Sequence, residues 1–223
     1  ILALNAPPVT RDQDGSLSLA LNRIYHSQYV NDTLAALRTR SASSTDVGHL
    51  GGAGSFALGV QEVGRFRVSY VTQRGSRIVN IVRIPYSIPD IDSICDDDDA
   101  IARLVDLVTS RKAGVLAVSG RNAVANGTFV YALLKRVNDQ ARQVVYILER
   151  SLTYLMSHQD SIIVQSELFS DVDSLAEGVE NAFLLKPDVM CVGDIRPSAR
   201  LEALPHLVES GVLLVGISVS LRA

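Results

Sequence analysis

The chain has 223 residues, of which 47% are hydrophobic and 20% are charged, and its formal net charge is −3. This composition is typical of a compact globular protein and excludes a disordered chain. The scattered lysines and arginines form no basic stripe, which argues against nucleic-acid binding, and no apolar run approaches the roughly 20 residues that span a bilayer.

The two cysteines, Cys95 and Cys191, lie far apart in the sequence, and neither belongs to a Cys-x-x-Cys motif or a cysteine–histidine cluster. A disulfide framework and a zinc site are therefore disfavoured, and we expect no bound metal. A reducing, cytoplasmic location fits this pattern best. The first four residues lack the basic region of a signal peptide and are too short for its apolar core.

In the first part of the chain, a helical pattern over residues 19–37 precedes three β-type apolar runs. The runs cover residues 56–60, 65–71 and 78–84. Gly64 and Gly75 separate the runs, as hairpin loops would. This order predicts an α+β domain over residues 1–84, with a PAS-like antiparallel sheet covered by a helix.

Residues 85–99 are predicted to be a linker, because Pro85 and Pro89 favour extended backbone and block helix formation. Four consecutive aspartates, residues 96–99, complete this segment. A Mg²⁺ site is the less favoured interpretation, since adjacent carboxylates point in different directions. We interpret the acids as caps of a helix over residues 100–110, whose dipole they complement.

From residue 100 to residue 223, strands and helices alternate as they do in parallel α/β domains. Strands are predicted at 115–119, 144–148, 162–164, 189–192 and 212–217. Helices are predicted at 128–138, 171–185 and 197–210. The strands are nearly continuous apolar runs, as expected when both faces of a sheet are covered.

One strand–turn–helix unit occupies the place of a phosphate-binding loop. An apolar run over residues 114–118 leads to Gly120, and a helix is expected from Thr128. A working loop needs a second glycine, a lysine, and a serine or threonine, which surround the phosphates and Mg²⁺. Those three places hold an alanine, Asn126 and Gly127. Taken alone, the segment is therefore interpreted as an ordinary βα turn.

Several motifs in the right order resemble the motor ATPases of type IV pilus retraction and type II secretion, the PilT/GspE-like family. The motifs are residues 64–68, 73–75, 83–85, 165–168, 186–196 and 210–216. The resemblance covers nearly the whole chain. It implies an N-terminal α+β domain followed by a RecA-like P-loop NTPase-type α/β domain, and assembly through the surfaces that form the family's hexameric ring. The chain is expected to lack the family's C-terminal helical segment.

The resemblance places a nucleotide-binding loop at Gly120, Asn126, Gly127 and Thr128. The family's Walker A lysine falls on Asn126, and its Mg²⁺-binding serine falls on Gly127. The phosphates would then have no ammonium group opposite them, and the metal would lose a hydroxyl ligand. The resemblance therefore implies weakened triphosphate binding.

Two carboxylates fall on the family's catalytic positions. The acidic Glu-Asp-Pro-x-Glu sequence is Glu149-Arg150-Ser151-Leu152-Thr153 here and keeps one acid of three, and the Walker B glutamate falls on Asp194. In the histidine box, Val219 stands in place of one histidine, and Val212 replaces a second one. Glu149 and Asp194 are therefore expected to be remnants of a catalytic site.

Arginines of the family's N-terminal domain reach the nucleotide phosphates, and the resemblance points to Arg65, Arg67 and Arg83. Alternation with Phe66 and Val68 also explains Arg65 and Arg67 as the solvent face of a strand. This second interpretation is favoured, because without a phosphate the arginines have little left to bind.

Together these features lead us to expect a pseudo-ATPase with a structural or regulatory role in a type IV pilus or secretion system. The implied partners are further copies of the chain or an active family ATPase, and a platform protein of the inner membrane. The expected location is the cytoplasm or the inner face of that membrane. No cofactor is expected.

Two other hypotheses remain open. A weak or unconventional ATPase would hold ATP and Mg²⁺ through Glu149, Asp194 and Arg196, with a lysine supplied from another position. The candidates for that lysine are Lys112, Lys135 and Lys186. Alternatively, the vacant cleft would bind another ligand such as a cyclic dinucleotide, although no motif supports this.

Overall fold

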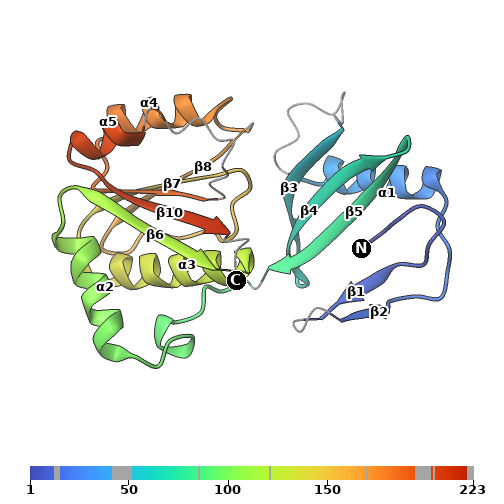
Figure 1. Cartoon of the computed structure of the whole chain (residues 1–223), viewed down its shortest axis with the longest axis horizontal. Coiled ribbons are helices and arrows are strands. Elements are labelled where there is room, and N and C mark those ends of the chain that lie inside the picture. The colour runs from blue at the N-terminus through green and yellow to red at the C-terminus, as the bar shows by residue number, and fades with distance from the viewer. Residues whose placement is uncertain are drawn as a thin grey trace. The chain divides into compact units, whose positions relative to one another are not determined.

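Figure 1 shows the computed structural model of the chain, which describes residues 1–12, 16–41, 52–84, 86–120, 122–168, 170–193, 202 and 204–219. At residues 123, 218 and 219 the description covers the backbone alone. The chain divides into two compact units, residues 1–86 and 87–223. Each unit has a sheet and a buried core of its own.

The first unit contains an antiparallel sheet of three strands in the order β3-β4-β5. The strands are β3 (Ala53–Val60), β4 (Gly64–Gln73) and β5 (Ser76–Ile84). A two-residue turn, Arg74-Gly75, joins β4 to β5, and both residues have positive φ angles, 50° and 75°. Turns of this kind match the twist of the flanking strands. The turn pairs Gln73 with Ser76 and thereby fixes the register of the hairpin.

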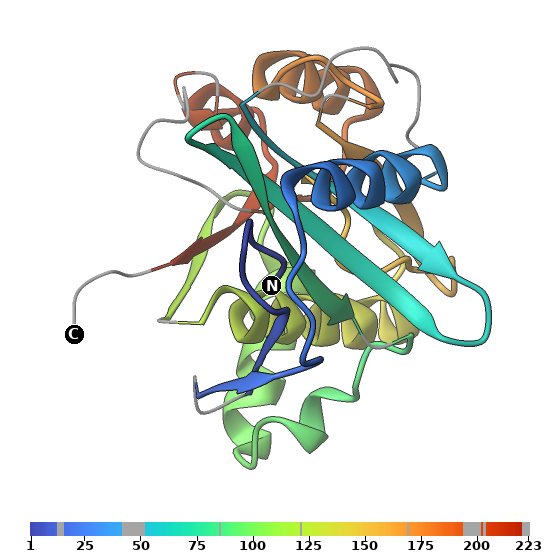
Figure 2. The same cartoon turned by 90° about the vertical axis from the view of Figure 1, so that its right-hand side faces the viewer.

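A single helix among the described residues of this unit, α1 (Ser27–Thr39), packs against the sheet (Figure 2). Val30 and Leu34 lie one turn apart on α1 and are almost fully buried. They join a core formed with Tyr25, Phe56, Val68, Tyr70 and Val79. This helix and sheet match the predicted α+β arrangement.

A short hairpin of β1 (Val9–Arg11) and β2 (Leu17–Leu19) precedes the helix. The helix predicted from residue 19 therefore begins later, at Ser27. Leu17 and Leu19 pair with β1 as a strand, so tertiary pairing prevails over the helical pattern at these residues.

The second unit is a parallel five-stranded sheet, in the order β6-β10-β9-β7-β8, between two layers of helices (Figure 1). The strands are β6 (Gly114–Gly120), β7 (Val144–Glu149), β8 (Ile162–Glu167), β9 (Val189–Val192) and β10 (Leu213–Val219). On one face lie α2 (Asp98–Ser110) and α3 (Ala123–Gln140), and on the other α4 (Leu175–Leu185) and α5 (Leu204–Glu209). The predicted RecA-like α/β fold is confirmed.

The core between β7 and α4 is tightly packed around Leu148. This side chain is fully buried in a cluster that includes Val179, Ala182, Met190 and Val192. Gly178 of α4 lies directly over it, and a Cβ atom added at that glycine would overlap Leu148 Cδ2. The glycine therefore allows the helix to approach the sheet closely.

Part of the segment predicted as a linker is bound to the second unit. A 3₁₀ turn, η1 (Ile91–Ser93), lies beside α3. Lys135 Nζ is 2.6 Å from Asp90 Oδ1, and the guanidinium of Arg136 pairs with the carboxylate of Asp92. Two ion pairs and the buried side chain of Ile91 thus hold the segment against the helix.

The four-aspartate run caps α2, as predicted. Asp97 is the N-cap residue, and its Oδ1 accepts a hydrogen bond from the backbone N–H of Ala100 at 2.8 Å. Asp98 and Asp99 lie in the first turn, where acids interact favourably with the helix dipole. Among the described residues no group of three or more metal-ligating side chains converges, and none of their helices is long and apolar enough to cross a membrane.

Candidate functional site

In open α/β sheets, ligands bind at the carboxyl ends of the strands. Here β6 ends at Gly120, β7 at Glu149, and β8 at Glu167. The residues that follow these strand ends therefore form the candidate site.

Helix α3 begins at residue 123, three positions after the last residue of β6. Residues 123–128, which would form the second half of a phosphate-binding loop, belong to the first turns of α3. Asn122 is the N-cap, and its Oδ1 accepts hydrogen bonds from the N–H groups of Val124 at 3.0 Å and Ala125 at 3.2 Å. Its carbonyl oxygen accepts from Asn126 N–H at 3.0 Å. Three amides that could face an anion are thus bonded to Asn122.

Asn126, at the position of the Walker A lysine, folds back onto the end of β6. Its side-chain Nδ2 donates to the carbonyl oxygen of Gly120 at 3.2 Å, and the residue is 9% exposed. A Cβ atom at Gly120 would lie 2.5 Å from Asn126 Oδ1, so the carboxamide fills the space beside that glycine. Gly127 is buried as well.

We expect Asn122→Ala to lower the free energy of unfolding by about 1 kcal/mol, because it removes the side-chain acceptor of two N-terminal amides of α3. Urea unfolding followed by circular dichroism measures this change. Asn122→Asp should stay close to wild type, since a carboxylate also caps a helix. Equal stability of the alanine variant and the wild type would contradict the capping role.

Glu149, predicted as a catalytic remnant, is 5% exposed at the carboxyl end of β7. Its Oε2 accepts hydrogen bonds from the hydroxyl of Tyr131 at 3.1 Å and from the backbone N–H of Thr153 at 2.8 Å. A Cβ atom at Gly193 would come within 2.5 Å of Glu149 Oε1, so the carboxylate also packs against the residue that precedes Asp194. The carboxylate thus connects α3 to the segment after β7.

A second buried acid, Glu167, is 8% exposed and pairs in register with Glu149 on the neighbouring strand. Its Oε1 accepts from the backbone N–H of Leu152 at 2.8 Å. On the same strand, Gln165 accepts from Met156 N–H and donates to Tyr154 O. Side chains of β7 and β8 therefore hold the segment 150–156 by its backbone.

Two tyrosines fill the interior beside these acids. Tyr131 of α3 is fully buried and Tyr154 is 2% exposed, and their ring centroids are 5.2 Å apart. The Tyr154 hydroxyl lies 3.2 Å from Thr128 Oγ1, the last of the predicted loop residues. Sequence reasoning missed this pair, since no motif marks either tyrosine.

Burial, and secondarily the Glu149 carboxylate, raise the pKa values of Tyr131 and Cys191 well above their ordinary values. Both groups are therefore neutral at physiological pH. Cys191 lies on β9 and is fully buried, whereas Cys95 is partly exposed.

We therefore expect a disulfide reagent at neutral pH to modify Cys95 rapidly and to leave Cys191 unmodified, because a buried neutral thiol does not attack. Absorbance of the released thiolate measures the reaction, and Cys95→Ser should abolish the fast phase. Rapid modification of Cys191 in the folded protein would contradict its burial.

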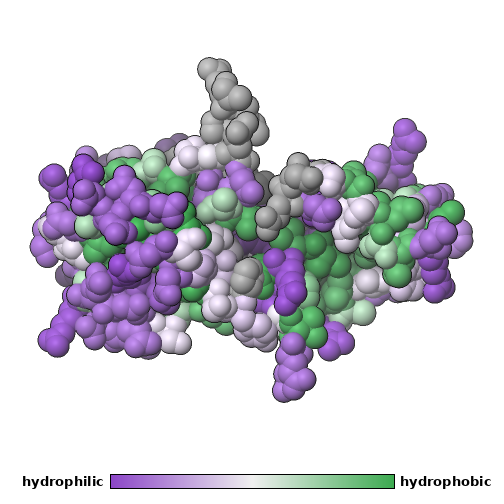
Figure 3. Space-filling model, turned by 90° about the horizontal axis from the view of Figure 1, so that it is seen from below, coloured by the Kyte–Doolittle hydropathy of each residue, from purple (hydrophilic) through white to green (hydrophobic). Residues whose placement is uncertain are grey.

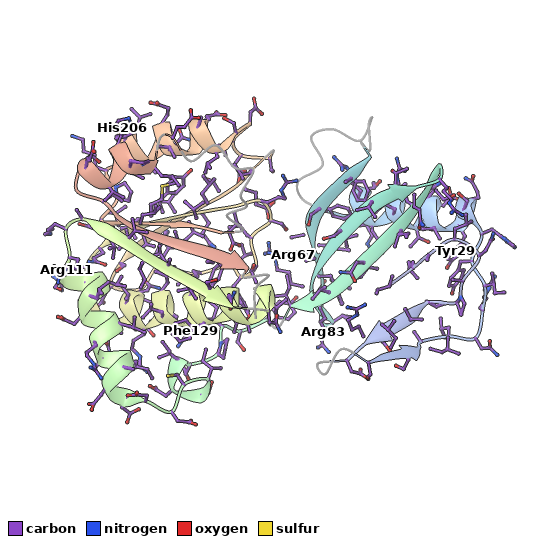
Figure 4. All side chains as sticks on the ribbon, in the orientation of Figure 1. Tyr29, Arg67, Arg83, Arg111, Phe129 and His206 are labelled. Carbon is purple, nitrogen blue, oxygen red and sulfur yellow. The ribbon has the colours of Figure 1, made fainter. Side chains whose placement is uncertain are left out.

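The remaining predicted residues are not gathered at one place. Asp194 lies outside the described residues. Arg65 and Arg67 alternate on β4 and share one face of the first unit's sheet, while Arg83 pairs with Phe66 and faces the other way (Figure 4). The three arginines therefore do not form a single cluster on that sheet.

No family model matches the chain. The type IV pilus ATPase PilU of Pseudomonas aeruginosa is 24% identical over 159 residues, which are 71% of this chain and 40% of PilU. The Escherichia coli protein YggR, described as uncharacterised, is 26% identical over 160 residues, 72% of this chain and 48% of YggR. The chain thus spans less than half the length of these relatives.

Comparison of the fold also points to a pilus ATPase. A crystal structure of the pilus retraction motor PilT with bound ADP superposes with a TM-score of 0.73 and 25% identity, covering 97% of this chain and 61% of that one. In sequence and in fold, the chain is similar to the pilus motor ATPases. The resemblance of its motifs is confirmed, and the likeness to PilT extends through both units of the chain.

Proposed function

We propose that this chain, which is similar to the pilus motor ATPases, is a pseudo-ATPase with a structural or regulatory role in a type IV pilus or secretion system. The observation that carries the proposal is the bonded first turn of α3, which follows the end of β6. Its amides are bonded to Asn122, and the carboxamide of Asn126 fills the space beside Gly120. A phosphate group would have to displace both side chains.

The positions of the lysines support the proposal. The chain has three, Lys112, Lys135 and Lys186. Lys112 and Lys186 precede β6 and β9 and therefore lie at the amino edge of the sheet, whereas the candidate site lies at its carboxyl edge. The seven residues of β6 alone span about 23 Å. Lys135 lies more than two turns along α3 from Asn126, and Asp90 and Asp139 both pair with it. None of the three replaces the missing ammonium group at the end of β6.

The acid retained in the family's acidic motif, Glu149, also supports the proposal. Phosphoryl transfer depends on groups aimed at the metal, the water and the phosphates. Glu149 is instead hydrogen-bonded to Tyr131 and Thr153, and its neighbour Glu167 to Leu152. Both carboxylates therefore hold the fold of the site together.

For the role in the cell, we propose that the protein assembles with its own copies or with an active ATPase of the family in the cytoplasm. A platform protein of the inner membrane would be its further partner. PilU is named as a type IV pilus ATPase and PilT as a pilus retraction motor, and the fold that both units share with PilT supports a place in the same kind of machine.

Titration with a fluorescent ATP analogue and Mg²⁺ tests the proposal, with an active PilT as the positive control. We expect no saturable binding up to millimolar concentrations and no phosphate release. Micromolar affinity with Mg²⁺-dependent phosphate release would instead establish the weak ATPase. A thermal shift with a cyclic dinucleotide alone would establish a different ligand for the site.

A further inference from the structure

A surface groove runs between α2, η1 and α3 of the second unit, away from the candidate site. It has a volume of about 730 Å³. The residues of α2 that line the groove recur three or four positions apart, as on one face of a helix. Ile101 and Val105 form its floor, and Asp98 and Asp106 lie beside them. In Figure 3 the region of α2 lies at the left of the picture, and hydrophilic residues predominate there.

The groove carries an excess of negative charge. Three carboxylates line it, from Asp92, Asp98 and Asp106, against one guanidinium, that of Arg136. The guanidinium is already paired with Asp92. Within the described part of the chain, Asp98 and Asp106 have no ion-pair partner, and the cap of α2 is supplied by Asp97.

We propose that this groove binds a basic, extended segment of a partner protein. The charge complementarity is direct, since two free carboxylates flank an apolar floor. Asp98 and Asp106 are eight residues apart on α2, which corresponds to about 12 Å. An extended peptide covers this distance in about four residues, so lysines or arginines at positions i and i+4 face the acids. An apolar residue at i+2 then faces the middle of this stretch, where Ile101 and Ala102 line the groove.

The groove lies outside the residues that the proposed function uses, so this inference does not depend on whether the protein binds nucleotide. The apolar floor between the acids distinguishes the groove from a merely charged surface, and it favours a peptide that carries an apolar residue between two basic ones.

Fluorescence anisotropy of a labelled peptide, acetyl-Lys-Ser-Leu-Ser-Lys-amide, against the intact chain at low ionic strength tests the proposal. We expect saturable binding that weakens as salt is added. The arginine version should bind as well or better, because its planar fork matches carboxylates. The glutamate version, with the same length and leucine, should not bind.

The matched variants are Asp98→Asn with Asp106→Asn, and Glu180→Gln with Glu209→Gln on α4 and α5, across the sheet. The first pair should weaken binding about tenfold, since each exposed charge pair contributes a factor of about three. The second pair loses the same charge and should bind as wild type does. Circular dichroism confirms that both variants fold.

Two results would overturn the proposal. One is the absence of binding by both the lysine and the arginine peptide at millimolar concentration. The other is equal weakening by the two pairs of substitutions, because net charge rather than the groove would then attract the peptide.

Discussion

Glu149→Ala is expected to lower the free energy of unfolding by about 3 kcal/mol. The substitution removes the acceptor of two buried donors, the hydroxyl of Tyr131 and the backbone N–H of Thr153. Each buried donor left without a partner costs about 1–3 kcal/mol. Urea unfolding followed by circular dichroism measures this loss of stability. In an active ATPase, where the glutamate is catalytic, the same substitution would mainly lower the turnover rate.

Two further variants distinguish the hydrogen bonds from other effects of the change. Glu149→Gln keeps one side-chain oxygen and should cost less than the alanine variant. Tyr131→Phe combined with Glu149→Ala removes the orphaned hydroxyl and should recover about 1 kcal/mol. If Glu149→Ala unfolds at the wild-type urea concentration, the carboxylate has no structural role.

Leu148→Ala is expected to cost about 3 kcal/mol, because the side chain is fully buried between β7 and α4 and its removal leaves a cavity. The neighbouring glycine offers a matched test. Gly178→Ala alone adds a methyl group where Leu148 Cδ2 lies, and the cost of overpacking, about 1–3 kcal/mol, exceeds the gain in helix propensity of about 1 kcal/mol.

When the two substitutions are combined, the new methyl group enters the space that Leu148 leaves. The double variant should therefore be more stable than the sum of the single changes predicts, by about 1 kcal/mol or more in a double-mutant cycle of urea midpoints. Strict additivity would show that the helix and the strand are not in the close contact described above.

The α/β fold could be predicted because its strands are recognisable in the sequence as apolar runs. The buried strand Val189–Val192 was predicted with its exact ends, and the strand of residues 144–148 needed one residue more. A strand covered on both faces is a continuous apolar run. When such runs alternate with helices, only a few chain topologies are possible for the domain.

The start of α3 was predicted five residues too late, at Thr128 instead of Ala123. Comparison with a phosphate-binding loop led us to expect irregular backbone, and Gly127 is a poor helix former. A local signal was present, since Asn122 is a favoured N-cap residue.

The network around Glu149 could not be predicted, because its partners come from distant places. Tyr131 is 18 residues away in sequence and Glu167 lies on another strand. Only the packing of α3 on the sheet brings these groups together. The opposite orientation of Arg83 likewise follows from the register that the Arg74-Gly75 turn imposes.

The environment of Asn126 also affects how readily this residue deamidates. Asparagine followed by glycine is prone to deamidation, in which the glycine nitrogen attacks the side-chain carbonyl, ammonia leaves, and a succinimide forms. Here both residues lie in α3, where the Gly127 N–H takes part in helical bonding, and Gly120 O holds the carboxamide. The folded protein therefore resists deamidation at this dipeptide, and unfolding exposes it to attack.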